Sequence, residues 1–151
     1  MKTEPSFNDI LNSLVHVWER RKSDETVISI SLPLTAIDPL LALSSLGDEH
    51  KFRFLWDRTP SLCFSAVGRC QHFDLSGPRR FELAQRFGDS VLGRLLDLTP
   101  EAPLHARPKV LYAFSFFDHC IDRKDPHGGS LPAAQAILPI WQLSRDRRKS
   151  W

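Results

Sequence analysis

The sequence of 151 residues has few of the features that mark specialised protein classes. It contains three cysteines, one methionine and one tyrosine, and its formal net charge is only +2. Such a small charge argues against a nucleic-acid or membrane partner, and no apolar run reaches the roughly 18 residues that a membrane-spanning helix needs. Hydrophobic residues make up 42% of the chain, which excludes the disordered and low-complexity classes. We expect one soluble segment.

The cysteines and the first residues indicate the compartment. An odd number of cysteines, Cys63, Cys70 and Cys120, argues against a disulfide framework. Residues 1–9 are too polar to begin a secretory signal. The sequence therefore predicts a cytoplasmic protein. Cys63 and Cys70 are expected on opposite faces of one strand, as ordinary buried thiols and not as a metal or disulfide pair.

Hydrophobic periodicity predicts an α+β fold, a mostly antiparallel sheet with two main helices. Helical spacing of apolar residues covers residues 6–22 and 77–98, and Asp38-Pro39 opens a short helix that ends near Ser45. In the second main helix, the expected apolar stripe consists of Phe81, Ala84, Phe87, Val91, Leu92 and Leu95.

Alternating and continuous apolar runs predict the strands. These strands cover residues 26–34, 51–56, 61–73, 109–117 and 137–146, with loops at 99–108 and 118–132. Gly68 lies inside an expected strand and indicates a bulge or a close backbone approach. The aromatic run 109–117 is expected to be a buried central strand.

Two motifs resemble ligand sites but have simpler explanations. Residues 118–122 read Asp-His-Cys-Ile-Asp, a spacing that matches no zinc signature, so we interpret the run as a solvated strand end. Gly128-Gly129 is accompanied by neither a Walker A motif nor a dinucleotide fingerprint, so it is interpreted as a turn.

Two further patterns resemble nucleic-acid contacts. The run Arg-Asp-Arg-Arg-Lys at 145–149 is short and contains an acidic residue, which favours a solvated strand edge or a chain terminus. Aromatic residues recur with period two, as in a base-stacking platform, but core faces have the same pattern more often. These aromatic residues are Phe52, Phe54, Trp56, Phe114 and Phe116. The residues alone therefore assign no catalytic, cofactor-binding or metal-binding side chain.

Three blocks, in order, resemble the amino-terminal half of the chorismate-utilising enzymes. The first combines Phe54-Leu-Trp-Asp-Arg-Thr-Pro60, Ala66-Val-Gly68 and Gly77-Pro-Arg-Arg-Phe81. The second is Pro108-Lys-Val-Leu-Tyr-Ala-Phe-Ser-Phe116, and the third is Leu131-Pro-Ala-Ala134 with Ile137-Leu-Pro-Ile-Trp-Gln-Leu143. The blocks are most similar to isochorismate synthase of menaquinone and phylloquinone biosynthesis. Anthranilate, aminodeoxychorismate and salicylate synthases share parts of the pattern and stay open as alternatives.

The resemblance implies an isomerase that converts chorismate to isochorismate with a lysine base, a glutamate acid and Mg²⁺ held by glutamates. In the family these groups belong to the carboxy-terminal half, beyond Trp151, and Lys149 does not match the catalytic lysine motif. Residues 1–151 are therefore expected to be the amino-terminal portion of an isochorismate synthase, inactive alone and an incomplete half of a layered α+β fold. Apolar surface and unpaired strand edges are expected where the missing catalytic half docks.

One departure from the family concerns packing. Tyr112 and Ala113 stand where the family has paired glycines in the central strand, so the packing of that strand is expected to differ. Two other functions stay open from the sequence: a stand-alone binding or interaction module that folds without a partner, and a small nucleic-acid binder that uses residues 145–149 and the aromatic strands.

Overall fold

The computed structural model describes residues 7–20, 26–35, 37–46, 52–57, 62–119, 132–146 and 149–151. Its helices are α1 (Phe7–Arg20), α2 (Pro39–Ser45) and α3 (Arg80–Gly93), with one 3-10 turn, η1 (Leu104–Ala106). The strands are β1 (Val27–Ser29), β2 (Arg53–Trp56), β3 (Leu62–Val67), β4 (Gln71–Leu75), β5 (Leu95–Asp97), β6 (Leu111–Phe114), β7 (Ala134–Leu138), β8 (Trp141–Asp146) and β9 (Lys149–Ser150). The predicted α+β class, with mostly antiparallel pairing, is confirmed.

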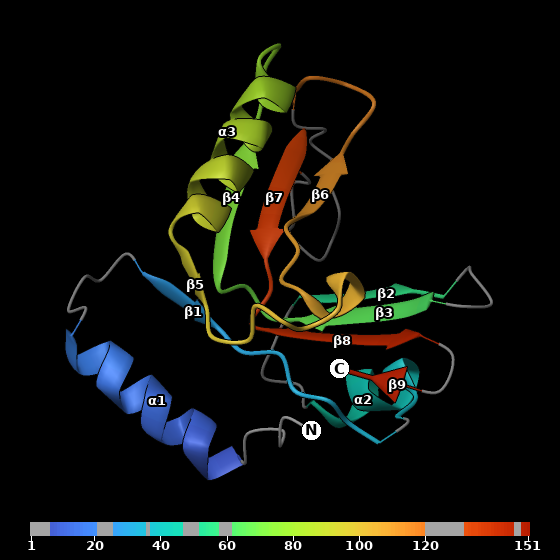
Figure 1. Cartoon of the computed structure of the whole chain (residues 1–151). Coiled ribbons are helices and arrows are strands. Elements are labelled where there is room, and N and C mark those ends of the chain that lie inside the picture. The colour runs from blue at the N-terminus through green and yellow to red at the C-terminus, as the bar shows by residue number, and fades with distance from the viewer. Residues whose placement is uncertain are drawn as a thin grey trace.

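The described strands form three sheets (Figure 1). One sheet has the order β2-β3-β8-β9, and together with α2 and η1 we call it the four-stranded body. A second has the order β4-β7-β6 and forms the three-stranded body with α3. The strands β1 and β5 pair in parallel as a small third sheet, and α1 stands to one side of both bodies in Figure 1.

The two bodies are joined by a bent antiparallel ribbon. The pair β3–β8 continues into the pair β4–β7, with Val67 opposite Trp141 on one side of the bend and Gln71 opposite Leu138 on the other. Three residues, 68–70, thus lie opposite two, 139–140, and Gly68 at the bend has a φ of 75°. This is the bulge expected at Gly68, because an extra residue bends a strand and lets it change sheets.

The bend corrects two of the expected strands. Residues 61–73 form β3 and β4 in different sheets, and residues 137–146 are divided between the end of β7 and β8. Period-two alternation continues through both segments, so the sequence gives the extended backbone but does not show where the ribbon turns. Pro139 lies at the turn, where its missing N–H removes no sheet hydrogen bond.

Both faces of the four-stranded sheet are covered. On one face α2 packs over Ser65, Val67 and Leu143, and the Asp38 side chain caps this helix by accepting from the Leu40 N–H at 2.9 Å. On the opposite face lies the segment of η1 and Lys109. Side chains alternate across a strand, so β3 and β8 are buried on both sides.

The end of the described chain is part of this body. The Ser150 side chain is 1% exposed, and its Oγ accepts from the Ile37 N–H at 3.1 Å. The backbones of Ser144 and Trp151 exchange two hydrogen bonds of 2.9 Å each. Arg145, Asp146 and Lys149 lie in the paired strands β8 and β9 at the edge of the sheet, in agreement with the predicted strand edge, and Arg147 and Arg148 lie outside the described residues.

The three-stranded body has a small core beneath α3. Leu75, Ala84, Ala134 and Ala136 form this core, with Leu83, Phe87 and Val110 packed against it. The buried stripe of α3 consists of Arg80, Ala84, Gly88 and Val91. The predicted stripe was partly wrong, because Phe81 and Leu92 are exposed while an arginine and a glycine are buried.

The remaining helix and strand predictions are close at the start of the chain and less accurate later. The helix expected at 6–22 is α1, and the short helix from Asp38-Pro39 is α2. The strand expected at 26–34 is shortened to β1, ahead of Pro33. The helix expected at 77–98 ends at Gly93, because residues 95–97 pair with β1.

The expected loop at 99–108 contains η1, and most of the loop expected at 118–132 lies outside the described residues.

The aromatic run 109–117 is not a central strand. Its strand, β6, is at the edge of the three-stranded sheet, and β7 takes the central place. The alanines Ala134 and Ala136 let β7 approach α3 closely, whereas three of the four residues of β6 are exposed. The apolar character of the run suggested burial, but it reflects aromatic side chains on an open edge.

Candidate functional site

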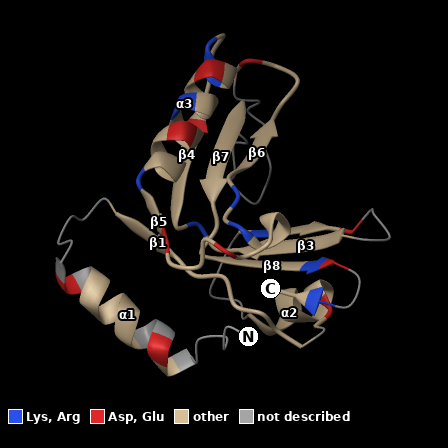
Figure 2. Ribbon diagram, viewed as in Figure 1, with Lys and Arg blue, Asp and Glu red and all other residues tan. Residues whose placement is uncertain are grey.

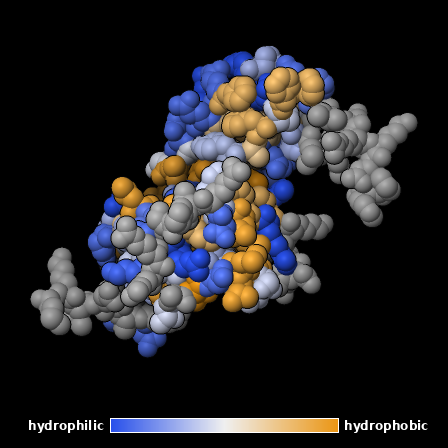
Figure 3. Space-filling view, turned by 90° about the vertical axis from the view of Figure 1, so that its right-hand side faces the viewer, coloured by the Kyte–Doolittle hydropathy of each residue, from blue (hydrophilic) through white to orange (hydrophobic). Residues whose placement is uncertain are grey.

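The most distinctive surface of the molecule lies along β6 and the start of α3. We call it the aromatic edge, and it consists of Phe81, Tyr112, Phe114, Phe116 and Phe117. Exposure ranges from 42% for Phe114 to 91% for Phe116. One side of β6 pairs with β7, and no strand of the described chain pairs with its other side. Figure 3 shows hydrophobic side chains gathered at the end of the molecule that holds α3 and β6.

The rings of the aromatic edge form two groups of contacting rings in spite of their exposure. The centroids of Phe81 and Phe114 are 4.7 Å apart, and the rings of Tyr112 and Phe114 are nearly parallel, 6.4 Å apart. Phe116 and Phe117 meet edge to face at 5.3 Å. Grouped aromatic residues on a surface are typical of protein interaction sites. An unpaired strand beside them adds backbone groups that another strand could pair with.

This surface corrects the prediction that the period-two aromatics form core faces. Phe114 and Phe116 belong to the exposed edge, and Trp56 is 50% exposed. Phe54 is half-buried and contacts the buried ring of Phe64 at 6.1 Å, so for this residue the prediction holds in part. Spacing shows which side chains share a face of a strand, but not whether anything covers that face.

Gly88 explains how the tyrosine at a family glycine position is accommodated. A Cβ atom at Gly88 would overlap the hydroxyl of Tyr112, so the tyrosine lies where only a glycine in the facing helix leaves room. The glycine of the strand is absent, and a glycine of α3 provides the close approach instead. No spacing or motif in the sequence connects Gly88 with Tyr112.

The Tyr112 hydroxyl has an altered acidity. Burial against α3 raises the pKa of this phenol, and the nearby carboxylate of Asp89 raises it further. Both effects disfavour the phenolate, since low polarity and a neighbouring negative charge oppose a second negative charge. The group is therefore neutral at physiological pH and acts as a packing side chain between the edge and α3.

Two cavities of the described chain have apolar linings. One, of about 460 Å³, lies between Leu14 of α1, the β1 segment and the loop around Pro139 and Trp141. The other, of about 400 Å³, lies beneath α2, against Val67 and Leu143. Neither lining includes a lysine, arginine, aspartate or glutamate. Neither cavity of the described chain thus offers the acid, base or cation that reactions of anionic substrates need.

Lys109 is the most enclosed charged group near these cavities, and its contacts are structural. Its Nζ donates to the carbonyls of His105 at 2.6 Å and Arg107 at 2.9 Å. It also lies 5.5 Å from the ring of Phe64. Burial lowers the pKa of the ammonium. The side chain closes the turn after η1 over the four-stranded sheet and does not project into a cavity.

Comparison with known families gives a match. The sequence profile of the family described as chorismate binding enzyme matches residues 11–151. The chain belongs to this family. Comparison with curated proteins and with solved structures gives no significant match. Within the described residues, no helix has the length and apolar character that crossing a membrane requires.

The motif at residues 118–122, whose composition resembles a metal site, lies only partly within the described residues. Asp118 and His119 are exposed and contact each other at 3.2 Å, and Cys120 and Asp122 lie outside the described residues. No three His, Cys, Asp or Glu side chains of the described chain gather closely enough to hold a metal ion. Gly128-Gly129 also lies outside the described residues.

The two described cysteines are not on one strand, which corrects the prediction that they occupy opposite faces of the same strand. Cys63 is on β3 and buried, whereas Cys70 precedes β4 in the bend and is exposed. Both are free thiols. Burial raises the pKa of both, and at Cys63 the carboxylate of Asp57 raises it further. Both are thereby kept as thiols, which are poor nucleophiles.

Proposed function

We propose that this chain is the amino-terminal portion of an isochorismate synthase and that its aromatic edge docks onto the catalytic portion. The observation that carries the proposal is the unpaired strand β6, whose exposed aromatic rings lie beside it. Membership of the family and the three sequence blocks support the choice of enzyme. The docked portion would add a strand to β6 and cover the rings.

In this proposal the isomerisation is carried out by the second portion. The resemblance implies that a lysine activates water, that a glutamate assists the departing hydroxide, and that Mg²⁺ binds between glutamates and the substrate carboxylate. The described residues of this chain do not fit a metal site, and we assign them no step of the reaction. Their contribution is a rigid sheet that supports the other portion, because catalytic groups must be held in place by their surroundings.

Isochorismate synthase is preferred to the other members because the three blocks are most similar to it. Anthranilate, aminodeoxychorismate and salicylate synthases act on the same substrate, so product analysis separates them. The free thiols of Cys63 and Cys70 support a cytoplasmic protein. In this proposal the complete enzyme would supply isochorismate for the synthesis of menaquinone or phylloquinone.

The experiment combines this chain with a separately produced catalytic half of an isochorismate synthase. We expect no conversion of chorismate by the chain alone, and formation of isochorismate, identified by chromatography, when both portions are mixed. Binding without acid, base and metal does not lower the barrier. Turnover by the chain alone, or no complex between the portions, would overturn the proposal.

Substitutions at the aromatic edge make the test specific. Phe116→Ser, at a side chain that is 91% exposed, is expected to weaken the complex at least tenfold while changing stability by less than about 0.5 kcal/mol. Leu104→Ser is the matched control, because Leu104 is 78% exposed but lies on η1, away from the edge. Equal loss of binding in both variants would show that the edge is not the docking surface.

A further inference from the structure

Arg80, the first residue of α3, is a buried cation that has no counter-ion among the described residues. Only 8% of its surface is exposed. Its Nε is buried, and no hydrogen-bond acceptor of the described chain reaches it. The guanidinium lies over the ring of Phe81, with Cζ 4.4 Å from the ring centroid. This stacking fixes the orientation of the group but provides no acceptor for its N–H donors.

An arginine in this position cannot avoid its charge. The guanidinium stays protonated in proteins, unlike a buried lysine, which can become neutral. A buried charge without a partner is strongly unfavourable, whereas a carboxylate placed against the guanidinium compensates it through paired hydrogen bonds. The structure thus contains one half of an ion pair.

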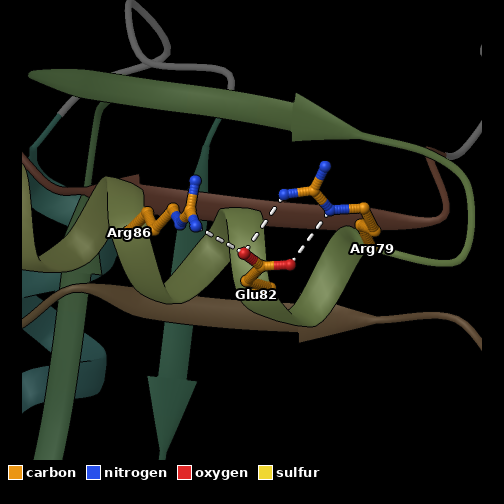
Figure 4. Close-up of polar contacts among 3 residues, drawn as sticks. All are labelled: Arg79, Glu82 and Arg86. Atoms are coloured by element: carbon orange, nitrogen blue, oxygen red, sulfur yellow. Dashed lines mark hydrogen bonds and ion pairs between the residues drawn. The ribbon is translucent and has the colours of Figure 1, made fainter.

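The nearest acidic residue on α3 is already engaged. Glu82 binds Arg79 through two contacts of 3.0 and 3.2 Å, and Arg86 through one of 2.7 Å (Figure 4). These three side chains lie on the exposed side of the helix. Arg79 and Arg86 share the carboxylate of Glu82, and no ion pair joins Arg80 to an acidic side chain of the described chain.

The start of α3 adds a second source of attraction for an anion. Arg79 occupies the N-cap position, and no side chain there accepts from the N–H groups of the first turn. The N–H of Arg80 donates to the carbonyl of Gly77 at 3.2 Å, so this donor is already satisfied. Unsatisfied N–H groups and the helix dipole both favour a negative charge at this end. Gly77, with a φ of 92°, forms the turn that leads the chain into the helix at this point.

We propose that Arg80 and the first turn of α3 form a binding site for a carboxylate. A flat carboxylate fits one guanidinium edge-on and needs only one cation. The carboxylate belongs either to a small molecule or to an acidic side chain of a docked protein. This inference goes beyond the proposed function and does not depend on it, because the unpaired charge is present whichever surface docks.

The test compares the urea unfolding midpoint in sodium malonate with that in sodium chloride at equal ionic strength. Malonate is a compact dicarboxylate and also stabilises proteins in general, so the variant Arg80→Met measures the general effect. We expect a saturable rise of the midpoint in the wild type that is absent from Arg80→Met. Arg79→Met, at the neighbouring but exposed arginine, is the matched control and should keep the rise. Equal rises in the wild type and Arg80→Met would overturn the proposal.

A second variant and a second readout secure the result. Arg80→Lys keeps the charge but lacks Nε, so it should lose most of the malonate effect even if Arg80→Met folds poorly. In the wild type, the Nε–H resonance of Arg80 should shift with malonate until it saturates. Saturation by chorismate at a lower concentration than by malonate would identify a small-molecule site, and equally weak saturation by both would identify an acidic side chain. Absence of any saturable shift would contradict the site.

Discussion

The two bodies differ in the side chains of their edge strands. In the four-stranded body α2 and η1 cover opposite faces, and the edge strand β2 combines Arg53 with the exposed side chains of Leu55 and Trp56 and is followed by Asp57. In the three-stranded body the edge strand β6 carries aromatic residues. Charged residues at an edge discourage further pairing, whereas an apolar edge invites it. The comparison indicates that the three-stranded body leaves an aromatic strand edge open, which under the proposed function is where the catalytic portion docks.

The core of the three-stranded body is small. Beneath α3 three of the four buried core residues are alanines, and only Leu75 is large. Leu83, Phe87 and Val110 pack against this core, and Val91 is also buried, whereas Phe81 and Phe114 lie on the aromatic edge. Stability follows the apolar area removed from water. The three-stranded body thus leaves two large aromatic side chains largely exposed, and the proposed docking would cover them.

The largest effect is expected from Leu75→Ala. Truncation of a buried leucine costs about 2–5 kcal/mol of unfolding free energy, because it leaves a cavity in a small core. Three of the four tryptophans, Trp56, Trp141 and Trp151, lie in the four-stranded body, and Trp18 on α1 is replaced by phenylalanine. Fluorescence then reports on the four-stranded body and far-UV circular dichroism on both bodies. In urea, both signals should shift together if the bent ribbon couples the bodies.

Leu143→Ala, in the four-stranded body, is the reciprocal control. It too should shift both signals by the same amount. A shift of the circular dichroism alone after Leu75→Ala would show that the three-stranded body unfolds independently. That outcome would sharpen the comparison, because the three-stranded body, which has the open strand edge, would then unfold separately from the four-stranded body.

A smaller but more local effect is expected from Gly88→Ala. The added Cβ would overlap Tyr112, and overpacking of this kind costs about 1–3 kcal/mol. Gly93→Ala is the matched control on the same helix, since nothing lies within 4 Å of a Cβ there. It should be neutral or stabilising by up to about 1 kcal/mol, because alanine is the better helix former.

A double-mutant cycle tests the cause. In a Tyr112→Ala background the overlap is gone, so Gly88→Ala should change from destabilising to neutral or stabilising. Urea midpoints of the four variants give the coupling free energy. If Gly88→Ala is equally harmful with and without the tyrosine, Tyr112 is not what makes glycine necessary at this position.

Sequence analysis predicted local structure well where the signal is local. The Asp38-Pro39 cap and the amphipathic spacing of α1 depend on neighbouring residues, and both helices were placed within a few residues. The bulge at Gly68 was also predicted. The division of the ribbon into two sheets was not, because alternation is the same whether or not a strand turns at residue 68.

The candidate site was harder to predict for a physical reason. Aromatic residues with period two indicate a face, and burial of that face depends on what else packs there, so Phe114 and Phe116 were expected in a core. Phe81 joins the edge through its contact with Phe114 in a distant segment, which no spacing reveals. Arg80 and Gly88 interrupt the apolar stripe of α3, although both are buried. An arginine at a stripe position was the one available signal for the carboxylate site.

The smallest effect concerns the acidity of Tyr112, which is the only tyrosine of the chain. Its pKa in the folded protein is raised above the ordinary value of 10.0 by burial and by Asp89. The fold favours the neutral phenol, so this contribution to stability is fully present below pH 10.0 and falls as pH rises through the folded pKa. Ultraviolet absorbance follows this single phenol, and urea-unfolded protein gives the reference titration. Asp89→Asn should move the folded titration part of the way back, whereas Asp74→Asn, on the face of the sheet opposite α3, should not. A folded titration that coincides with the unfolded one would show that Tyr112 is solvated, and the close packing of β6 on α3 would have to be abandoned.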